Sequence, residues 1–238
     1  MMKKLVFAVF AAAMLACGVQ ASAQVIAIGA GYSNSVNRTS TTGDMKADYF
    51  NGFNLGITYG FPIAQGVELV PGIQYEYLMK NKNWIVIKEN DTDHYLNVPL
   101  HFKLNFDVNP TIRFFVQAGP TFSVGLASSS RFQLIGNTDQ MTYDNYAGQI
   151  TSSTEGLIPD NLRQWLANAS PYMGKFVTGG SEYQRFDVLL GGAVGVDFSK
   201  MLRLKVGYDF GMVNRFSNDF TDATRHRQRF YAGLAYLF

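Results

Sequence analysis

The sequence predicts an all-β fold: an eight-stranded antiparallel up-and-down transmembrane β-barrel with long extracellular loops, one carrying a short helix. Three observations support this prediction: segments that alternate apolar with polar or small residues, a secretory leader, and connections that alternate between short and long. Side chains alternate across a strand, so a strand with one wholly apolar face can meet lipid on that side. Because lipid cannot satisfy the edge of an open sheet, such strands must close into a barrel.

Eight segments follow the alternating pattern, and their apolar faces hold no Lys, Arg, Asp or Glu. A charge at the bilayer midplane costs roughly 2–4 kcal/mol for Arg or Lys, which explains the exclusion. In the last segment, Phe230, Tyr236 and Phe238 lie on the apolar face, and together they resemble the C-terminal signal of outer-membrane β-barrel proteins. The expected strands are 25–33, 51–61, 67–79, 94–106, 111–124, 185–198, 202–212 and 226–238.

The N-terminus has the order of a secretory signal peptide. Lys3 and Lys4 precede the apolar run 5–16, and small residues at 21–23 provide a cleavage site. We expect residues 1–23 to be removed, which leaves 24–238 as a single barrel domain. The only cysteine, Cys17, lies in this leader, so the mature chain has no disulfide or thiol chemistry. The alternative is a lipid anchor on Cys17, because the residues before it loosely resemble a lipoprotein cleavage box.

Charge and hydropathy narrow the class of protein further. The chain has 20 Lys and Arg and 18 Asp and Glu, and the leader removes two lysines, which leaves 18 of each sign. This balance provides no basic field, so we expect no nucleic-acid partner. No stretch after the leader approaches an apolar 20-mer, so strands rather than helices would have to cross the membrane.

The connections between the expected strands alternate in length. Short turns at 62–66, 107–110 and 197–201 alternate with long polar segments, and this asymmetry is typical of barrels with periplasmic turns and extracellular loops. Both termini would then lie in the periplasm. Pro99 and Pro120 fall inside expected strands and predict local bulges, because proline cannot donate a ladder hydrogen bond. The long segments are 34–50, 80–93, 125–184 and 213–225.

The segment 125–184 is too long to be a bare connection. Within it, residues 158–169 have a helical pattern, with Leu162, Trp165 and Leu166 on one stripe. One interpretation is a short helix that caps the barrel mouth. The other is a surface for a protein partner, because loops on a rigid scaffold often carry function.

Charged residues fall on the polar faces of the expected strands. The interior of an eight-stranded barrel is just wide enough for side chains, so we expect these charges to pair and plug the lumen. The alternative is a narrow polar conduit or a proton path. The expected lumen charges are Glu68, Glu76, Lys103, Arg113, Arg185, Asp187, Arg203, Lys205, Asp209 and Arg229.

Three alternating arginines precede the apolar part of the last strand. Arg225, Arg227 and Arg229 share one strand face. They could meet anionic lipopolysaccharide at the outer rim, or neutralise Asp219, Asp222 and the acids of the lumen. The second interpretation is favoured.

The histidines give no clear catalytic or metal motif. His101 is expected to face inward with Ser123 and Asp187 as possible neighbours, but no spacing fixes a triad. A polar lumen histidine is therefore favoured over a membrane hydrolase or acyltransferase. His94 and His226 near the outer rim lack metal-ligand spacing. We expect no catalytic residue, no cofactor and no metal.

Three stretches carry a resemblance to a known family: Tyr95-Leu-Asn-Val-Pro-Leu-His-Phe-Lys-Leu, Phe115-Val-Gln-Ala-Gly-Pro and Leu204-Lys-Val-Gly-Tyr-Asp-Phe-Gly. Over essentially the whole mature chain, the sequence resembles the PorT-like outer-membrane β-barrel family of Bacteroidetes-type bacteria. The resemblance implies an eight-stranded barrel in the outer membrane. Some members of that family are linked to protein secretion, and the family offers no functional residues to carry over.

The expected function is a non-enzymatic outer-membrane barrel with a plugged lumen, in an envelope-structural or surface-binding role through its extracellular loops. The alternatives are an accessory barrel of a secretion or assembly machine, a small solute channel, and a membrane enzyme. The expected partners are outer-membrane lipid and lipopolysaccharide, the barrel-assembly machinery through the C-terminal strand, and an extracellular or periplasmic protein.

Overall fold

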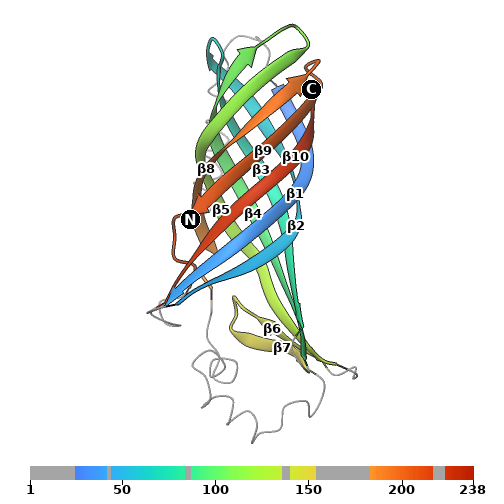
Figure 1. Cartoon of the computed structure of the whole chain (residues 1–238), viewed down its shortest axis with the longest axis vertical. Helices are drawn as coiled ribbons and strands as arrows, with labels where there is room; N and C mark the ends of the chain where they lie inside the picture. The colour runs from blue at the N-terminus through green and yellow to red at the C-terminus, as the bar shows by residue number, and fades with distance from the viewer. Residues whose placement is uncertain (1–24, 42–43, 84–86, 136–139, 154–182, 217–222) are drawn as a thin grey trace, which may run out of the picture.

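The computed structural model describes residues 25–41, 44–83, 87–135, 140–153, 183–216 and 223–238. All strand pairs are antiparallel, and neighbours follow the order β4-β3-β2-β1-β10-β9-β8-β5, with a β4–β5 pairing that closes the ring (Figure 1). The prediction of an eight-stranded antiparallel barrel is confirmed. The strands are β1 (Val25–Thr41), β2 (Asp44–Ala64), β3 (Val67–Asn83), β4 (Ile87–Asp107), β5 (Ile112–Leu134), β6 (Gln140–Asp144), β7 (Gln149–Ser153), β8 (Phe186–Phe198), β9 (Leu202–Gly211) and β10 (Thr224–Leu237).

The wall of the barrel is apolar outside and polar inside. On β2, Leu55 and Ile57 are 47% and 52% exposed, whereas Asn54 is 9% exposed. This reverses the arrangement of a water-soluble sheet, in which the apolar face is buried. The apolar residues of the alternating pattern therefore form the outer surface of the folded barrel, as a lipid-facing wall requires.

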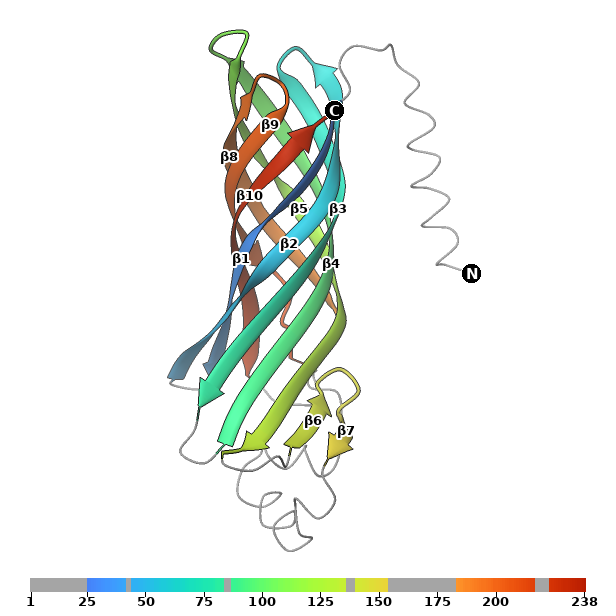
Figure 2. The same cartoon turned by 90° about the vertical axis from the view of Figure 1, so that its right-hand side faces the viewer.

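The barrel has two unlike ends. The C-terminus and the short turns after β2, β4 and β8 lie at one end, here named the turn end (Figure 2). At the other end, β1 to β5 continue beyond the ranges predicted for them, and this is named the extension end. Here the predicted loops 34–50 and 80–93 are wrong, because strand pairing continues until only residues 42–43 and 84–86 separate the strands.

The predicted loop 125–184 also contains strand. β5 runs on to Leu134, and β6 and β7 form a hairpin at the extension end, opposite the end that holds the C-terminus (Figure 1). β8 pairs with β5 only as far as Val124↔Phe186, and β6 pairs with the next part of β5, including Phe132↔Met141. The hairpin therefore covers an edge of β5 that β8 leaves free.

Pro99 and Pro120 do not cause bulges. Both lie in ladders that keep one register on either side of the proline, and the shift in the β4–β5 ladder falls instead between His94 and Tyr95. A missing N–H removes one ladder hydrogen bond, but it requires no inserted residue.

The predicted helix 158–169 and the predicted leader 1–23 lie outside the described residues. In the part of the chain that is described, no helix has the length and apolar character needed to cross a membrane.

Candidate functional site

The first ionic cluster of the interior lies near the turn end. Asp197 and Arg203 are direct partners on β8 and β9, and the guanidinium binds the carboxylate through two bonds of 2.7 and 2.8 Å. Lys103 Nζ lies 3.3 Å from Glu68 Oε2 and 3.5 Å from Asp197 Oδ2. The ring of Phe115 lies under both cations, with its centroid 4.8 Å from Lys103 and 4.9 Å from Arg203. The four charged residues of this turn-end cluster come from four strands, and Phe115 adds a fifth.

A second cluster lies farther along the interior. Arg229 and Asp209 are direct partners on β10 and β9, with Arg229 Nε donating to Asp209 Oδ2 at 2.9 Å. Glu76 of β3 forms an ion pair with Arg227 and lies 3.7 Å from Arg229. Asn97 Nδ2 also donates to Glu76 Oε2 at 3.0 Å. Two carboxylates and two guanidinium groups, all at most 2% exposed, therefore compensate one another in this central cluster.

Between the two clusters, polar side chains leave almost no free space. His101 contacts Thr121 Oγ1 at 3.1 Å and the Gln117 side-chain nitrogen at 3.0 Å. The remaining cavity, lined by His101, Lys205 and Tyr231 among others, measures about 10 Å³. That volume holds about one water molecule.

At the extension end, arginine and aromatic side chains cover the interior. Arg215 is 2% exposed and donates to the hydroxyls of Tyr95 at 2.6 Å and Tyr146 at 3.3 Å. Tyr183 and Phe216 stack beside it with ring centroids 5.8 Å apart. Arg215, in the segment after β9, therefore links β4 to the turn between β6 and β7.

One lysine beside this mouth, beyond the apolar wall, is surrounded by carboxylates. Lys80 Nζ lies 2.9 Å from Asp91, 3.2 Å from Asp48 and 3.8 Å from Glu89. Burial lowers the pKa of Lys80, but the three carboxylates outweigh it, so this pKa lies above its ordinary value. Burial raises the pKa of Asp91 more than Lys80 lowers it. The Lys80 cluster is therefore an acid-rich site that depends on one cation.

The turn end holds a pocket of about 490 Å³ whose lining includes Lys103, Arg113, Lys200 and Arg203. Its rim is a tight turn in which Ser199 and Lys200 have φ of 50° and 56°. Such left-handed conformations normally favour Gly or Asn, so a lysine here carries local strain. Ser199 N also donates to Thr111 O at 2.6 Å, which ties this turn to the neighbouring one.

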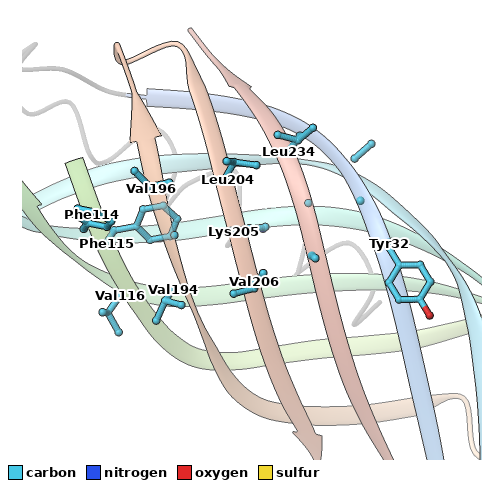
Figure 3. A pocket seen from close by; sticks show the side chains of 15 residues that line it. Tyr32, Phe114, Phe115, Val116, Val194, Val196, Leu204, Lys205, Val206 and Leu234 are labelled. Atoms are coloured by element: carbon cyan, nitrogen blue, oxygen red, sulfur yellow. The ribbon is translucent and has the colours of Figure 1, made fainter. Parts of the chain in front are cut away.

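The outer wall has an apolar groove of about 810 Å³ across β5, β8, β9, β10 and β1. Figure 3 shows Val116, Val194, Val206, Leu234 and Tyr32 along it. Its position within the apolar wall makes it a lipid-facing surface, and Lys205, the charged residue of its lining, extends inward toward the ring of Tyr231.

Most of the predicted lumen charges come together in the two clusters. Glu68, Lys103 and Arg203 lie in the turn-end cluster, whereas Glu76, Asp209 and Arg229 lie in the central one. Lys205 lies inside with its Nζ 5.6 Å from the ring centroid of Tyr231. Asp187 is 3% exposed and accepts a long bond, 3.4 Å, from Val213 N.

Two predicted charges lie elsewhere. The Arg113 side chain is 30% exposed at the turn end, where it pairs with Asp107. Arg185 is exposed and donates to the carbonyl oxygens of Gly125 and Leu126, so its prediction as a lumen charge is wrong. The reason is local: β8 begins only at Phe186, and strand alternation does not extend to the preceding residue.

Among the described residues, sequence reasoning left six buried charges out of the expected lumen set: Asp91, Asp93, Asp197, Arg215, Arg225 and Arg227. Asp197 fell in a predicted turn and Arg215 in a predicted loop. Arg227 shares its strand face with Arg225 and Arg229, and this alternation was the available signal. Arg225, Arg227 and Arg229 are buried, at 8%, 0% and 2% exposure, and so face the interior and not the outer surface.

The histidines do not assemble a catalytic triad in the described part of the chain. His101 contacts Thr121 and Gln117, whereas Ser123 Oγ donates to Asn97 Oδ1 at 2.7 Å. His94 Nδ1 lies 2.6 Å from the hydroxyl of Tyr75 on the outer wall. Among the described residues no group of His, Cys, Asp and Glu could hold a metal ion.

Two predicted sites remain, the C-terminal aromatic signal and the partner surface. Phe230, Tyr236 and Phe238 point outward, at 46%, 45% and 67% exposure. The predicted partner surface, Leu162, Trp165 and Leu166, lies outside the described residues.

Residues 22–217 match the family described as "Outer membrane protein beta-barrel domain". The chain belongs to this family. The family places the barrel in the bacterial outer membrane, in agreement with the apolar outer wall. No curated protein matches the chain.

Solved outer-membrane barrels resemble the chain in fold. The attachment invasion locus protein Ail of Yersinia pestis has 13% identity and a TM-score of 0.40, covering 91% of this chain and 100% of that one. Neisserial surface protein A has 11% identity and a TM-score of 0.40, covering 89% and 99%. The outer membrane enzyme PagL has 11% identity and a TM-score of 0.38, covering 86% and 97%. At these identities the likeness concerns the barrel fold alone.

Proposed function

We propose that the protein is a closed, non-enzymatic outer-membrane barrel that acts at its extension end, in an envelope-structural or surface-binding role. The observation that supports this most directly is the filled interior. Two compensated ionic clusters and an arginine–aromatic layer leave a cavity of about 10 Å³ between the clusters, room for about one water. A barrel that transports nothing has only its outer surfaces with which to act.

The proposal includes an orientation, with the extension end outside the cell and the turn end in the periplasm. Short turns and both ends of the barrel chain usually lie on the periplasmic side. Ala47 faces outward at the extension end and Lys200 lies at the turn end. In intact cells, an impermeant maleimide should label Ala47→Cys and leave Lys200→Cys unlabelled until lysis. The reverse pattern would contradict this orientation.

Conductance tests the closed barrel. Purified wild-type protein in a planar bilayer should give no discrete openings, because ions would have to displace paired charges. A matched variant, Tyr95→Ala/Arg215→Ala, removes the layer at the extension end and leaves both ionic clusters, so it should stay closed as well. Discrete openings of the wild type would contradict the proposal.

The surface role is tested in cells that lack the gene. Wild-type protein should restore envelope integrity or surface adhesion, measured by dye uptake and cell binding. A variant with residues 136–182 replaced by a short Gly/Ser connection should reach the outer membrane and fail to restore the phenotype. Full restoration by this variant would count against a role for that part of the extension end.

The turn-end pocket favours a second candidate function, an accessory barrel of a secretion or assembly machine of the kind the PorT-like resemblance implies. Four cationic side chains, together with the carboxylates of Asp107 and Asp197, line a pocket of about 490 Å³ on the proposed periplasmic side, which leaves an excess of positive charge. A pull-down in mild detergent should then recover a stoichiometric periplasmic protein, and Arg113→Ala/Lys200→Ala should lose it. Equal recovery of the partner by wild type and by the double variant would contradict the pocket as the docking site.

A further inference from the structure

On the long strands of the extension end, the described acidic side chains point inward, whereas the charged side chains that point outward are cations. On β4, Lys88 points outward and is exposed, whereas Glu89, Asp91 and Asp93 point inward toward the Lys80 cluster and the mouth. Because strand side chains have a period of two, a slip of one residue would turn these acids outward. The register therefore fixes which sign faces the surroundings.

The same segregation holds on neighbouring strands. Arg38 of β1 and Arg131 of β5 are outward and exposed, whereas Asp48 of β2 pairs inward with Lys80. Within the described part of the chain, Arg38, Lys88 and Arg131 have no hydrogen-bond or ion-pair partner. An acidic residue could occupy each of these outward positions, but the acids of these strands face inward instead.

One acid of the β6–β7 hairpin shares the outward side. In the β5–β6 ladder, Asp144 lies opposite Ser129. Its Oδ1 accepts hydrogen bonds from the amides of Tyr146 and Ala147 at 2.8 and 2.9 Å. Its carboxylate is therefore bound in a turn of its own chain and does not pair with Arg131.

Two of the outward cations are close together. In the β4–β5 ladder, Arg131 lies opposite Asn90, and Lys88 is the next outward position of β4. The two cations are therefore diagonal neighbours about 7–8 Å apart. Lys88 lies six residues beyond His94, the outward residue that contacts Tyr75. At about 3.3 Å per residue and a tilt of about 45°, this places Lys88 on the order of 14 Å beyond that aromatic level. This height lies outside the hydrocarbon, in the polar layer of the leaflet.

We propose that Lys88 and Arg131, with Arg38 on the opposite wall, bind phosphate groups of the lipopolysaccharide that surrounds the barrel. The proposal rests on the orientation given above, which puts this wall in the outer leaflet. Cations near an anionic membrane surface gain binding energy, and an outward carboxylate would lose it. Unpaired arginine and lysine at this level therefore match a phosphate-bearing glycolipid, with arginine able to bind one phosphate through two N–H groups.

The test uses folded full-length protein titrated with phosphatidylcholine vesicles that contain purified lipopolysaccharide. Lys88→Ala/Arg131→Ala should bind these vesicles roughly 10–30-fold more weakly than wild type, because each cation near an anionic surface contributes a factor of roughly 3–5 to the affinity. Arg131→Lys keeps the charge and should retain most of the affinity. Lys200→Ala removes an exposed cation at the turn end and serves as the matched control with unchanged affinity. Heat-modifiable mobility on gels verifies that each variant is folded.

Two further vesicle preparations identify the chemistry. Dephosphorylated lipopolysaccharide should bind wild type as weakly as intact lipopolysaccharide binds the double variant. Equal binding of the phosphorylated and dephosphorylated forms would overturn the proposal, as would equal affinity of wild type and double variant. Binding to phosphatidylglycerol vesicles as tight as to lipopolysaccharide would also overturn it, because any anionic lipid would then suffice. Labelling of Ala47→Cys tests the orientation separately.

Discussion

Arg227 and Glu76 lie on strands that are not neighbours, yet their side chains form an ion pair across the interior of the barrel. β10 and β3 are separated in the ring by β1 and β2. Arg227 also donates to Ser123 Oγ of β5 at 3.1 Å and Ser35 Oγ of β1 at 3.2 Å. A single guanidinium group therefore joins four strands, and the pairing of charges across the lumen contributes directly to barrel closure.

Removal of the Glu76 carboxylate should destabilise the barrel strongly. In Glu76→Leu, Arg227 and Arg229 remain buried with one carboxylate fewer, and a broken buried pair costs about 3–5 kcal/mol. Urea unfolding in lipid vesicles, followed by circular dichroism, measures the loss. Removal of both partners in Glu76→Leu/Arg227→Leu should cost less than the sum of the single changes.

An exposed ion pair at the turn end provides the control for this prediction. The Asp107 side chain is 66% exposed and pairs with Arg113. Asp107→Asn should change the free energy of unfolding by less than about 1 kcal/mol. A loss for Glu76→Leu no larger than for Asp107→Asn would show that the interior ion pairs do not hold the barrel together.

The inward position of Glu76 can be predicted from sequence, but its partner cannot. Tyr75 and Tyr77 flank it on the apolar face, so alternation alone places the carboxylate inside. Arg227 is 151 residues away, and the two meet only because the ring closes between β1 and β10. Sequence spacing does not show which interior charges lie at the same height along the barrel axis, because the stagger of the strands around the barrel determines that height.

The ends of the strands were predicted too short for a related reason. The sequence criterion was an apolar outward face, and that criterion applies only where lipid surrounds the wall. Beyond Ser33 the outward residues of β1 include Asn34 and Arg38, although pairing with β2 continues to Thr41↔Asp44. Backbone hydrogen bonding therefore continues where the selection for apolar side chains stops. The hairpin β6–β7 is absent from the sequence prediction for the same reason, because its strands lack a long apolar outward face.

Stability at the extension end should depend on pH through Lys80. Its raised pKa means that its contribution is complete below its ordinary pKa of 10.5 and is lost as pH rises above that value. In Lys80→Gln the carboxylates of Asp91, Asp48 and Glu89 lack their cation, so their ionised forms are disfavoured. The deficit relative to wild type should be about 2 kcal/mol near pH 7. It should narrow as acid protonates the carboxylates and again above pH 10.5 as wild-type Lys80 loses its proton.

The measurement is urea unfolding of both proteins across this pH range. Lys88→Gln is the matched control, because Lys88 is exposed and has no partner in the described residues. Its deficit should be near zero at every pH. A deficit of Lys80→Gln that stays constant with pH would rule out the acid-rich cluster as its cause.

A glycine next to an aromatic ring sets the packing of the lumen. Gly207 is the direct partner of Tyr231, and a Cβ at Gly207 would lie 2.3 Å from Tyr231 Cζ. Gly207→Ala should therefore displace the ring and destabilise the barrel by about 1–3 kcal/mol. In the Tyr231→Ala background, where the ring is absent, Gly207→Ala should cost much less. An equal cost in both backgrounds, measured by unfolding in vesicles, would show that the ring is not the obstacle.

Arginine substitutions along β2 should locate the boundary of the hydrocarbon. Leu55 and Ala47 face outward on the same strand, eight positions apart, with Leu55 in the apolar wall and Ala47 on the extension. Leu55→Arg should destabilise the protein by roughly 2–4 kcal/mol, because the charge would lie near the bilayer midplane. Ala47→Arg, in the polar layer, should change the free energy of unfolding by less than about 1 kcal/mol. Equal large losses would place the extension within the hydrocarbon, and two negligible losses would show that the apolar wall does not face lipid.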